Sequence, residues 1–161
     1  MKKYYIIQPK AGFSNCLRVV FSYYQYAKNK NLHLIVIWKV TTACNGFFLD
    51  YFEEIDGITF YKKNYLNFKV DYTGFWFNKK YSPYKMFIYN ELKLKPSLIY
   101  KITTNLCKIN KYISVHIRRT DHIPLAKKKK LFTTDEEFIN FLNINKKDKN
   151  IFIATDNHNT Y

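Results

Sequence analysis

The chain has 161 residues, of which 47% are hydrophobic, so it is long enough to bury a core and too hydrophobic to be a disordered protein. Its net charge of +15 favours anionic partners, but the lysines are scattered as well as clustered, and the many Lys, Asn, Ile, Tyr and Phe residues follow A/T-rich codon usage. Three widely spaced cysteines exclude a recognisable zinc site or disulfide framework, and without a signal peptide or an apolar run near about 20 residues we expect a soluble, cytoplasmic protein.

The N-terminal quarter predicts a strand, a helix and a second strand. Residues 4–7 form a short apolar run that predicts the first strand. Residues 15 to about 29 place apolar side chains at helical spacing, and the continuous apolar run 32–38 is typical of a strand in a parallel sheet covered on both faces. Together these elements predict a βαβ unit.

The turn between the first strand and the helix has two interpretations. We expect Gly12 to take a positive φ and Ser14 or Asn15 to cap the helix. Such a turn directs backbone N–H groups and the positive end of the helix dipole at an anion, and Arg18 lies one helical turn further on. The alternative is an ordinary connection between a strand and a helix.

The middle of the chain is predicted less completely. Residues 47–52 predict a short helix or turn, and residues 58–61 predict a short strand. We assign no order to residues 62–90, which are rich in Tyr, Phe, Lys and Asn. Residues 96 to about 109 predict a helix with proline in its first turn.

A second βαβ unit is predicted near the C-terminus. Two apolar runs, 112–117 and 150–155, predict buried strands. Between them, a loop at 122–126 precedes a capping box formed by Thr134 and Glu137. The helix that this box opens is expected to direct four apolar side chains inward: Phe138, Ile139, Phe141 and Leu142.

Two adjacent arginines, Arg118 and Arg119, follow the predicted strand at 112–117. Only three of the 27 Lys and Arg residues are arginine, whose planar fork binds phosphate bidentately as lysine cannot. In open α/β sheets ligands bind beyond the carboxyl ends of strands. The pattern predicts a phosphate-binding strand end that includes His116 and Asp121. An Arg–Asp pair that staples the loop explains the same residues equally well.

Three segments together resemble the GDP-fucose-dependent fucosyltransferases, in particular the α-1,6-fucosyltransferase and nodulation fucosyltransferase group and the related protein O-fucosyltransferases. The most specific is H-x-R-R-T-D at 116–121, supported by A-T-D-N at 154–157. The loop at 12–18 resembles the family's G-x-x-N-x-[LM] loop. The resemblance implies an α/β, GT-B-type glycosyltransferase built from Rossmann-like βαβ units. Residues 1–110 would be the first domain, and residues 111–161 the start of the donor-binding domain.

The resemblance also implies an activity and a site. The enzyme would transfer fucose from GDP-fucose to a glycan or protein acceptor with inversion, without a metal or cofactor. Arg118 would stabilise the charge that develops on the leaving diphosphate. The resemblance places the following residues at GDP-fucose: Asn15, His116, Arg118, Arg119, Asp121 and Asp156.

The segment after R-R-T-D departs from the family's pattern. Relatives commonly place a glutamate there as a candidate general base, whereas no carboxylate follows Asp121 before Asp135 in this chain. His122 could accept the proton in its place, since histidine titrates near neutral pH. The alternative is that His122 is an ordinary polar loop residue.

Only two strands are predicted after residue 110, whereas a doubly wound donor domain needs several. We therefore expect a C-terminally truncated donor domain, weak GDP binding at best, no measurable fucosyl transfer, and self-association through an uncovered strand at 151–153. Two alternatives remain open. One is a basic α/β nucleic-acid-binding module, which would use the net positive charge and the run Lys127–Lys130. In the fucosyltransferase interpretation the same lysines either extend the phosphate site or form a solvated loop. The other is a non-catalytic protein with the GDP-sugar fold.

Overall fold

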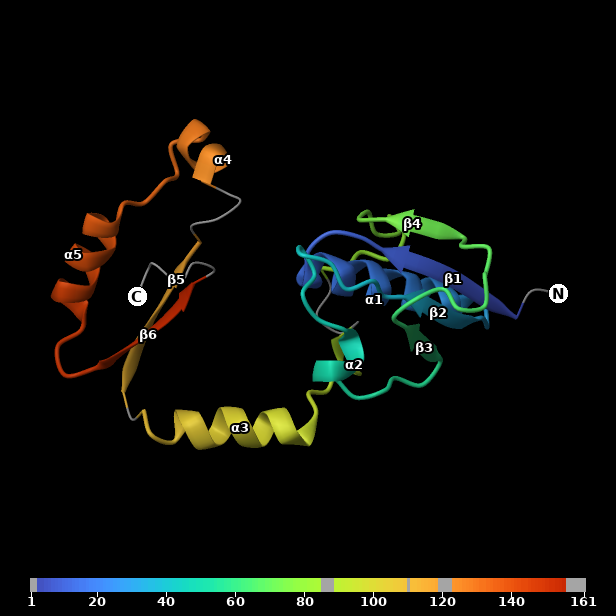
Figure 1. Ribbon diagram of the computed structural model, residues 1–161, viewed down its shortest axis with the longest axis horizontal. Coiled ribbons are helices and arrows are strands. Elements are labelled where there is room, and N and C mark those ends of the chain that lie inside the picture. The colour runs from blue at the N-terminus through green and yellow to red at the C-terminus, as the bar shows by residue number, and fades with distance from the viewer. Residues whose placement is uncertain (1–2, 85–88, 110, 119–122, 156–161) are drawn as a thin grey trace. The chain divides into compact units, whose positions relative to one another are not determined.

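The computed structural model describes residues 3–84, 89–109, 111–118 and 123–155, which form two compact units, Met1–Ile99 and Tyr100–Tyr161. Each unit contains a parallel sheet and helices, so the predicted α/β class is confirmed (Figure 1). The boundary falls inside helix α3 (Pro96–Leu106), and the domain limits of 1–110 and 111–161 remain a prediction. None of the helices among the described residues is both long and apolar enough to cross a membrane.

The first unit is built on a four-stranded parallel sheet in the order β3-β2-β1-β4. Helix α1 (Phe13–Asn29) joins β1 to β2, which pair in parallel, so the predicted βαβ unit is confirmed. The short helix α2 (Phe48–Tyr51) lies where a helix or turn was predicted. Strand β4 lies within residues 62–90, for which no elements were predicted. The strands are β1 (Tyr4–Pro9), β2 (His33–Ile37), β3 (Ile58–Tyr61) and β4 (Tyr72–Gly74).

Both faces of this sheet are covered, which explains why β2 is apolar after its exposed first residue, His33. Side chains alternate along a strand, so Leu34 and Val36 belong to the core that α1 covers, whereas Ile35 and Ile37 face the other side. Figure 1 shows α1 lying along one face of the sheet. The opposite face is covered by Tyr61, the last residue of β3, and by Phe68 and Val70 from the segment after it.

A cluster of aromatic rings fills the core between β2, β3 and α2. Phe48 is fully buried, and its ring stacks on that of Phe60 with 4.0 Å between centroids and 6° between planes. The indole of Trp38 packs 5.8 Å from the ring of Phe48 and 5.0 Å from that of Phe13. Phe13 is the first residue of α1, so this cluster joins the start of α1 to the sheet.

The turn before α1 differs from the predicted one. Ala11, and not Gly12, has the positive φ, at 86°. Gly12 is the N-cap residue, with φ −65° and ψ 162°, so the prediction that Ser14 or Asn15 caps the helix is wrong. Any residue can adopt these angles, and a Cβ on Gly12 would lie 3.4 Å from the carbonyl oxygen of Ala43, an ordinary contact.

Replacing Ala11 with glycine is therefore expected to stabilise the protein, because a left-handed backbone costs an L-residue about 1–2 kcal/mol. Part of that gain is lost to the greater freedom of glycine in the unfolded chain, so we expect the free energy of unfolding to rise by about 0.5–1 kcal/mol. Gly12→Ala is the matched exchange and should not destabilise the protein. Urea unfolding of both variants measures the difference, and a strong destabilisation by Gly12→Ala alone would contradict it.

The second unit contains two parallel strands, β5 (Tyr112–Ile117) and β6 (Asn150–Thr155), which pair from Tyr112 with Asn150 to Ile117 with Thr155. The chain between them forms α4 (Ile123–Lys128) and α5 (Asp135–Asn145), so the second predicted βαβ unit is confirmed. The loop predicted at 122–126 is wrong from Ile123 onward, because α4 begins there. The predicted capping box is confirmed: Thr134 Oγ1 accepts a hydrogen bond from Glu137 N at 3.2 Å, and Glu137 Oε2 accepts one from Thr134 N at 2.6 Å.

Burial in this unit is shallower than predicted. Val115 and Ile117 are the buried hydrophobic side chains among its described residues, so β5 is buried on one face only. Strand β6 is not a buried strand, since Ile151 and Phe152 are 41% and 45% exposed. Two helix residues predicted to point inward, Ile139 and Phe141, are exposed as well. The period-two and helical patterns located the elements correctly but did not determine how deeply they are covered.

Candidate functional site

The carboxyl end of β5 carries the described part of the predicted phosphate site. Val115 and Ile117 point into the core, and His116 between them is exposed on the opposite face, as alternation along a strand requires. Arg118 is the first residue after the strand and is exposed. The other predicted residues of this site lie outside the described residues: Arg119, Asp121, His122 and Asp156.

The position of Arg118 suits an anion-binding role. It follows Ile117, which pairs with Thr155 of β6, so Arg118 leaves the sheet at the edge where both parallel strands end. This is the edge at which open α/β sheets bind ligands, and a guanidinium there can bind two oxygens of one phosphate group. The sheet therefore delivers the most specific residue of the H-x-R-R-T-D segment to the expected edge.

The lysine run after this segment is partly helical. Lys127 and Lys128 occupy the last turn of α4, where positive charge is favourable beside the negative end of the helix dipole. The ammonium of Lys127 lies 5.1 Å from the centre of the Phe132 ring, a distance typical of a cation–π contact. These contacts give the lysines a local structural role, and none of them adds support for an extended phosphate site.

At the start of α1, Asn15 is paired with Arg18. The side-chain oxygen Oδ1 of Asn15 accepts a hydrogen bond from Nη2 of Arg18, one helical turn later. Nη1 of Arg18 donates to the hydroxyl of Tyr84 at 3.2 Å, and the guanidinium lies 5.9 Å from the centre of the Tyr84 ring. Asn15 therefore orients an arginine instead of capping the helix, and Arg18 becomes a candidate site residue that the sequence only hinted at.

The segment that carries Tyr84 is held on α1 by a buried hydroxyl. Ser22 is fully buried, and its Oγ donates to the carbonyl of Tyr81 at 2.6 Å. The same oxygen accepts a hydrogen bond from the backbone N–H of Asn78 at 2.9 Å. A buried serine inside a helix is satisfied here by long-range backbone partners, so the 78–84 segment has a fixed place beside Arg18.

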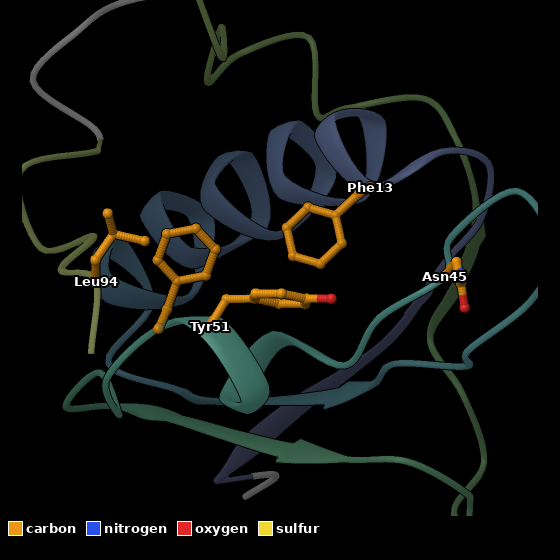
Figure 2. Close-up of a pocket in the computed structure, with 5 residues that line it drawn as sticks. Phe13, Asn45, Tyr51 and Leu94 are labelled. Atoms are coloured by element: carbon orange, nitrogen blue, oxygen red, sulfur yellow. The ribbon is translucent and has the colours of Figure 1, made fainter. Parts of the chain in front are cut away.

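The first unit also contains an aromatic pocket of about 360 Å³ (Figure 2). It lies beside the first residue of α1 and between α2 and the segment that precedes α3. The volume is in the range of small-molecule sites. Sequence reasoning missed this pocket, although the Asn-Gly turn at 45–46 followed by an aromatic run marks its location. The lining residues are Phe13, Asn45, Tyr51, Phe52 and Leu94.

Gly46 fixes the position of one wall of this aromatic pocket. Its carbonyl accepts a hydrogen bond from the buried Nε1 of Trp38 at 2.8 Å, which anchors the loop after β2. A Cβ at Gly46 would lie 2.5 Å from a ring carbon of Tyr51 and 2.7 Å from its hydroxyl oxygen. A side chain at position 46 would therefore force the partly exposed Tyr51 ring to shift.

A second pocket, of about 550 Å³, is basic. It lies where β2 and β3 end and is lined by residues from the two following loops: Lys39, Val40, Thr41, Lys62, Lys63 and Asn64. The ammonium of Lys62 lies 3.8 Å from a carboxylate oxygen of Asp50 and 4.9 Å from the centre of the Phe47 ring. Lysine is frequent throughout this chain, so these residues by themselves do not distinguish a binding site from a solvated edge.

Two cysteines lie beneath the turn at the start of α1, but neither is suited to nucleophilic chemistry. Burial, together with the neighbouring thiol of Cys44, raises the pKa of Cys16 from 9.0 to about 12. Burial also raises the pKa of Cys44. The thiolate is the reactive form, so both residues act as buried apolar side chains near neutral pH.

Alkylation at pH 8 is accordingly expected to label the exposed Cys107 quickly and the two buried cysteines only after unfolding. Because the folded state holds these protons more tightly than the unfolded state, the buried thiols should lower the free energy of unfolding as the pH rises from 9 towards 12. Mass spectrometry of iodoacetamide-treated native and urea-unfolded protein counts the labels. Rapid labelling of Cys16 or Cys44 in native protein would contradict the prediction.

Among the described residues, no group of three or more His, Cys, Asp or Glu side chains is arranged to hold a metal ion.

No protein-family model matches the sequence, and no curated protein matches it. Solved structures do match. The crystal structure of fucosyltransferase NodZ from Bradyrhizobium aligns over 99% of this chain and 74% of its own, with a TM-score of 0.56 and 14% identity. Crystal structures of NodZ α-1,6-fucosyltransferase soaked with GDP-fucose or co-crystallised with GDP give TM-scores of 0.57 and 0.55 at 14% identity. They also cover 99% of this chain, and 73% and 74% of their own chains respectively.

This likeness shows that the chain has a fucosyltransferase-like α/β fold with parallel sheets. At 14% identity it establishes the fold alone. None of these neighbours is described as a nucleic-acid-binding protein, so the alternative of a basic nucleic-acid-binding module is not favoured.

Proposed function

We propose that this chain is a glycosyltransferase of fucosyltransferase type, or an inactive remnant of one, and that its type of reaction is the transfer of fucose from GDP-fucose to a glycan or protein acceptor with inversion. The observation that carries the proposal is the place of Arg118, the central residue of H-x-R-R-T-D, at the carboxyl end of β5 in a chain with a fucosyltransferase-like fold. The solved neighbours include structures prepared with GDP-fucose and with GDP, which is consistent with a GDP-sugar donor.

In the proposed reaction the acceptor oxygen attacks the anomeric carbon of fucose from the face opposite the diphosphate. The bond between that carbon and the diphosphate oxygen breaks, and GDP leaves with the bonding electrons. Arg118 would bind the diphosphate and stabilise this charge as it develops. A hydrogen-bond donor that is already in position does so without the cost of reorganisation during the reaction. The acceptor's proton would pass to a general base, for which His122 is the candidate.

The remaining residues would bind the donor. His116 is exposed one residue before the end of β5, within reach of a nucleoside bound at that edge. Asn15, which accepts a hydrogen bond from Arg18, belongs to the proposed set through the resemblance of its loop to the family's loop. Arg119, Asp121 and Asp156 complete the proposed set, which requires no metal and no cofactor.

Calorimetry with GDP, GDP-fucose and ADP tests the proposal. We expect GDP and GDP-fucose to bind, and ADP to bind at least about ten-fold more weakly, because a site that hydrogen-bonds the edge of guanine leaves polar groups unpaired with adenine. Equal affinity for GDP and ADP would indicate that the site binds the diphosphate without recognising guanine. Absence of binding by either guanine nucleotide would contradict the proposed donor.

A further inference from the structure

We propose that the aromatic pocket of the first unit binds a neutral saccharide ring, the chemical class of acceptor that the proposed transfer would use. The inference rests on the proposed function in one respect only: a glycosyltransferase needs an acceptor. The identity of the ligand is argued from the pocket itself.

The lining of the aromatic pocket is uncharged. None of Phe13, Asn45, Tyr51, Phe52 and Leu94 carries a charge. An ionised ligand would lose its hydration in this pocket without gaining an opposite charge from the lining, which is strongly unfavourable. The basic pocket beyond β2 and β3 differs in this respect, because three of its lining residues are lysines. The occupant is therefore neutral.

The lining also contains polar groups that a purely apolar ligand would leave unsatisfied. The Asn45 carboxamide has two donors and an acceptor, and the Tyr51 hydroxyl can both donate and accept. Figure 2 shows the Tyr51 hydroxyl pointing to the side of the pocket that carries Asn45. The close approach of that hydroxyl to Gly46, the residue after Asn45, agrees with this view. Covering these groups without partners is costly, so the ligand must carry hydroxyl or amide groups along one edge.

The aromatic rings supply the other half of the recognition. The ring planes of Phe13 and Tyr51 are 88° apart, with 5.5 Å between centroids, so Phe13 contacts Tyr51 edge to face. Tyr51 remains 38% exposed. A pyranose ring has an apolar face of C–H groups and a rim of hydroxyls. The C–H face packs on the electron-rich face of an aromatic ring, and the hydroxyls reach the amide and phenol.

The pocket is held in shape by the backbone before a ligand arrives. Phe52 and Leu94 form an antiparallel bridge, and the carbonyl of Tyr51 accepts a hydrogen bond from Lys95 N at 3.0 Å. The opposite wall is anchored by the hydrogen bond from Trp38 to Gly46. A preformed pocket with a partly exposed aromatic ring needs little ordering on binding, which favours affinity.

Saturation-transfer NMR with neutral tetrasaccharides of glucose, galactose, mannose and N-acetylglucosamine tests the inference, followed by calorimetry of the best binder. We expect at least one to bind, Tyr51→Ala to weaken it about ten-fold or more, and Tyr51→Phe to weaken it less than about three-fold. Asn45→Ala, at an exposed site that does not endanger the fold, should weaken it by about three-fold. Tyr65→Ala is the matched control, because Tyr65 is exposed in the same unit and does not line the pocket.

Gly46→Ala provides an independent readout, because its Cβ would displace the Tyr51 ring without touching the ligand, and it should weaken saccharide binding. Guanosine and a hyaluronan tetrasaccharide, which carries carboxylates, serve as competitors. The inference is overturned if none of the four neutral saccharides binds. It is overturned equally if neither Tyr51→Ala nor Asn45→Ala weakens binding, or if either competitor displaces the saccharide.

GDP calorimetry on the same variants separates this inference from the proposed function. We expect Tyr51→Ala to bind GDP as the parent protein does. GDP binding without saccharide binding would contradict the proposed role of the aromatic pocket and support the proposed donor. Saccharide binding without GDP binding would contradict the proposed donor and support the proposed role of the pocket.

Discussion

Arg118→Lys is expected to lower the affinity for GDP by about 1–2 kcal/mol, or roughly five- to thirty-fold, while the protein stays folded. Lysine keeps the charge but loses the planar fork, so one bidentate pair of charge-assisted hydrogen bonds becomes a single contact. Arg118→Ala should lose more, because the charge is removed as well. Calorimetry with GDP measures both variants, and circular dichroism confirms that each retains its fold.

Lys149→Ala is the control for the overall charge. Lys149 is exposed and precedes β6, so it lies at the amino end of the same pair of strands that Arg118 leaves at the carboxyl end. Arg118→Ala and Lys149→Ala remove the same charge, and only the first should weaken GDP binding substantially. Equal losses would indicate attraction to a basic protein in general. Unchanged GDP affinity in folded Arg118→Lys, together with a lower melting temperature, would assign Arg118 to the structural Arg–Asp staple.

Phe48→Ala is expected to destabilise the first unit by about 3–5 kcal/mol. The Phe48 side chain is completely buried, and its removal leaves a cavity bounded by the rings of Phe60, Phe52 and Trp38. Since whole domains are stable by only about 5–15 kcal/mol, this is a large fraction of the total. Urea unfolding followed by the fluorescence of buried Trp38 reports on this cluster directly.

Two further variants make that measurement specific. Trp76 is 67% exposed, so Trp76→Phe removes the other tryptophan signal with little effect on stability. In that background Phe75→Ala is the matched control, because Phe75 is exposed in the same unit and its loss should change the free energy of unfolding by less than about 1 kcal/mol. A Phe48→Ala effect no larger than that of Phe75→Ala would contradict the packing described for α2.

Periodicity predicted the fold well where a segment has a single apolar pattern. The runs at 32–38 and 112–117 became β2 and β5, and Thr134 opens α5 with the expected capping box. Strand β4 was missed because it has only three residues and ends on glycine, and its partner β1 is distant in sequence. Depth of burial was also missed. Alternation shows which side of a strand is apolar, but it does not show what covers that side.

The candidate site was predicted unevenly for a similar reason. Arg118 could be singled out from the sequence because arginine is rare in this chain and because Arg118 directly follows a predicted strand. The turn at Ala11 could not be predicted, since glycine was the natural choice for a positive φ and stands one residue later. The aromatic pocket joins three segments that are distant in the sequence, so it exists only after the chain has folded.

The position of β1 in its sheet has a consequence for the order of events during synthesis. β1 is the first strand made, yet one of its two neighbours is β4, whose residues emerge much later. Asp71 closes that side, because its carboxylate accepts a hydrogen bond from Ile6 N at 2.8 Å and its own N–H donates to Ile6 O at 2.9 Å. A ribosome adds about 5–20 residues per second, so β4 is complete roughly 0.6–3 seconds after β3, and β1, β2 and β3 can assemble in that interval. During that interval β1 is an edge strand with unpaired N–H and C=O groups, and it is then that the nascent chain is most exposed to pairing with the wrong strand.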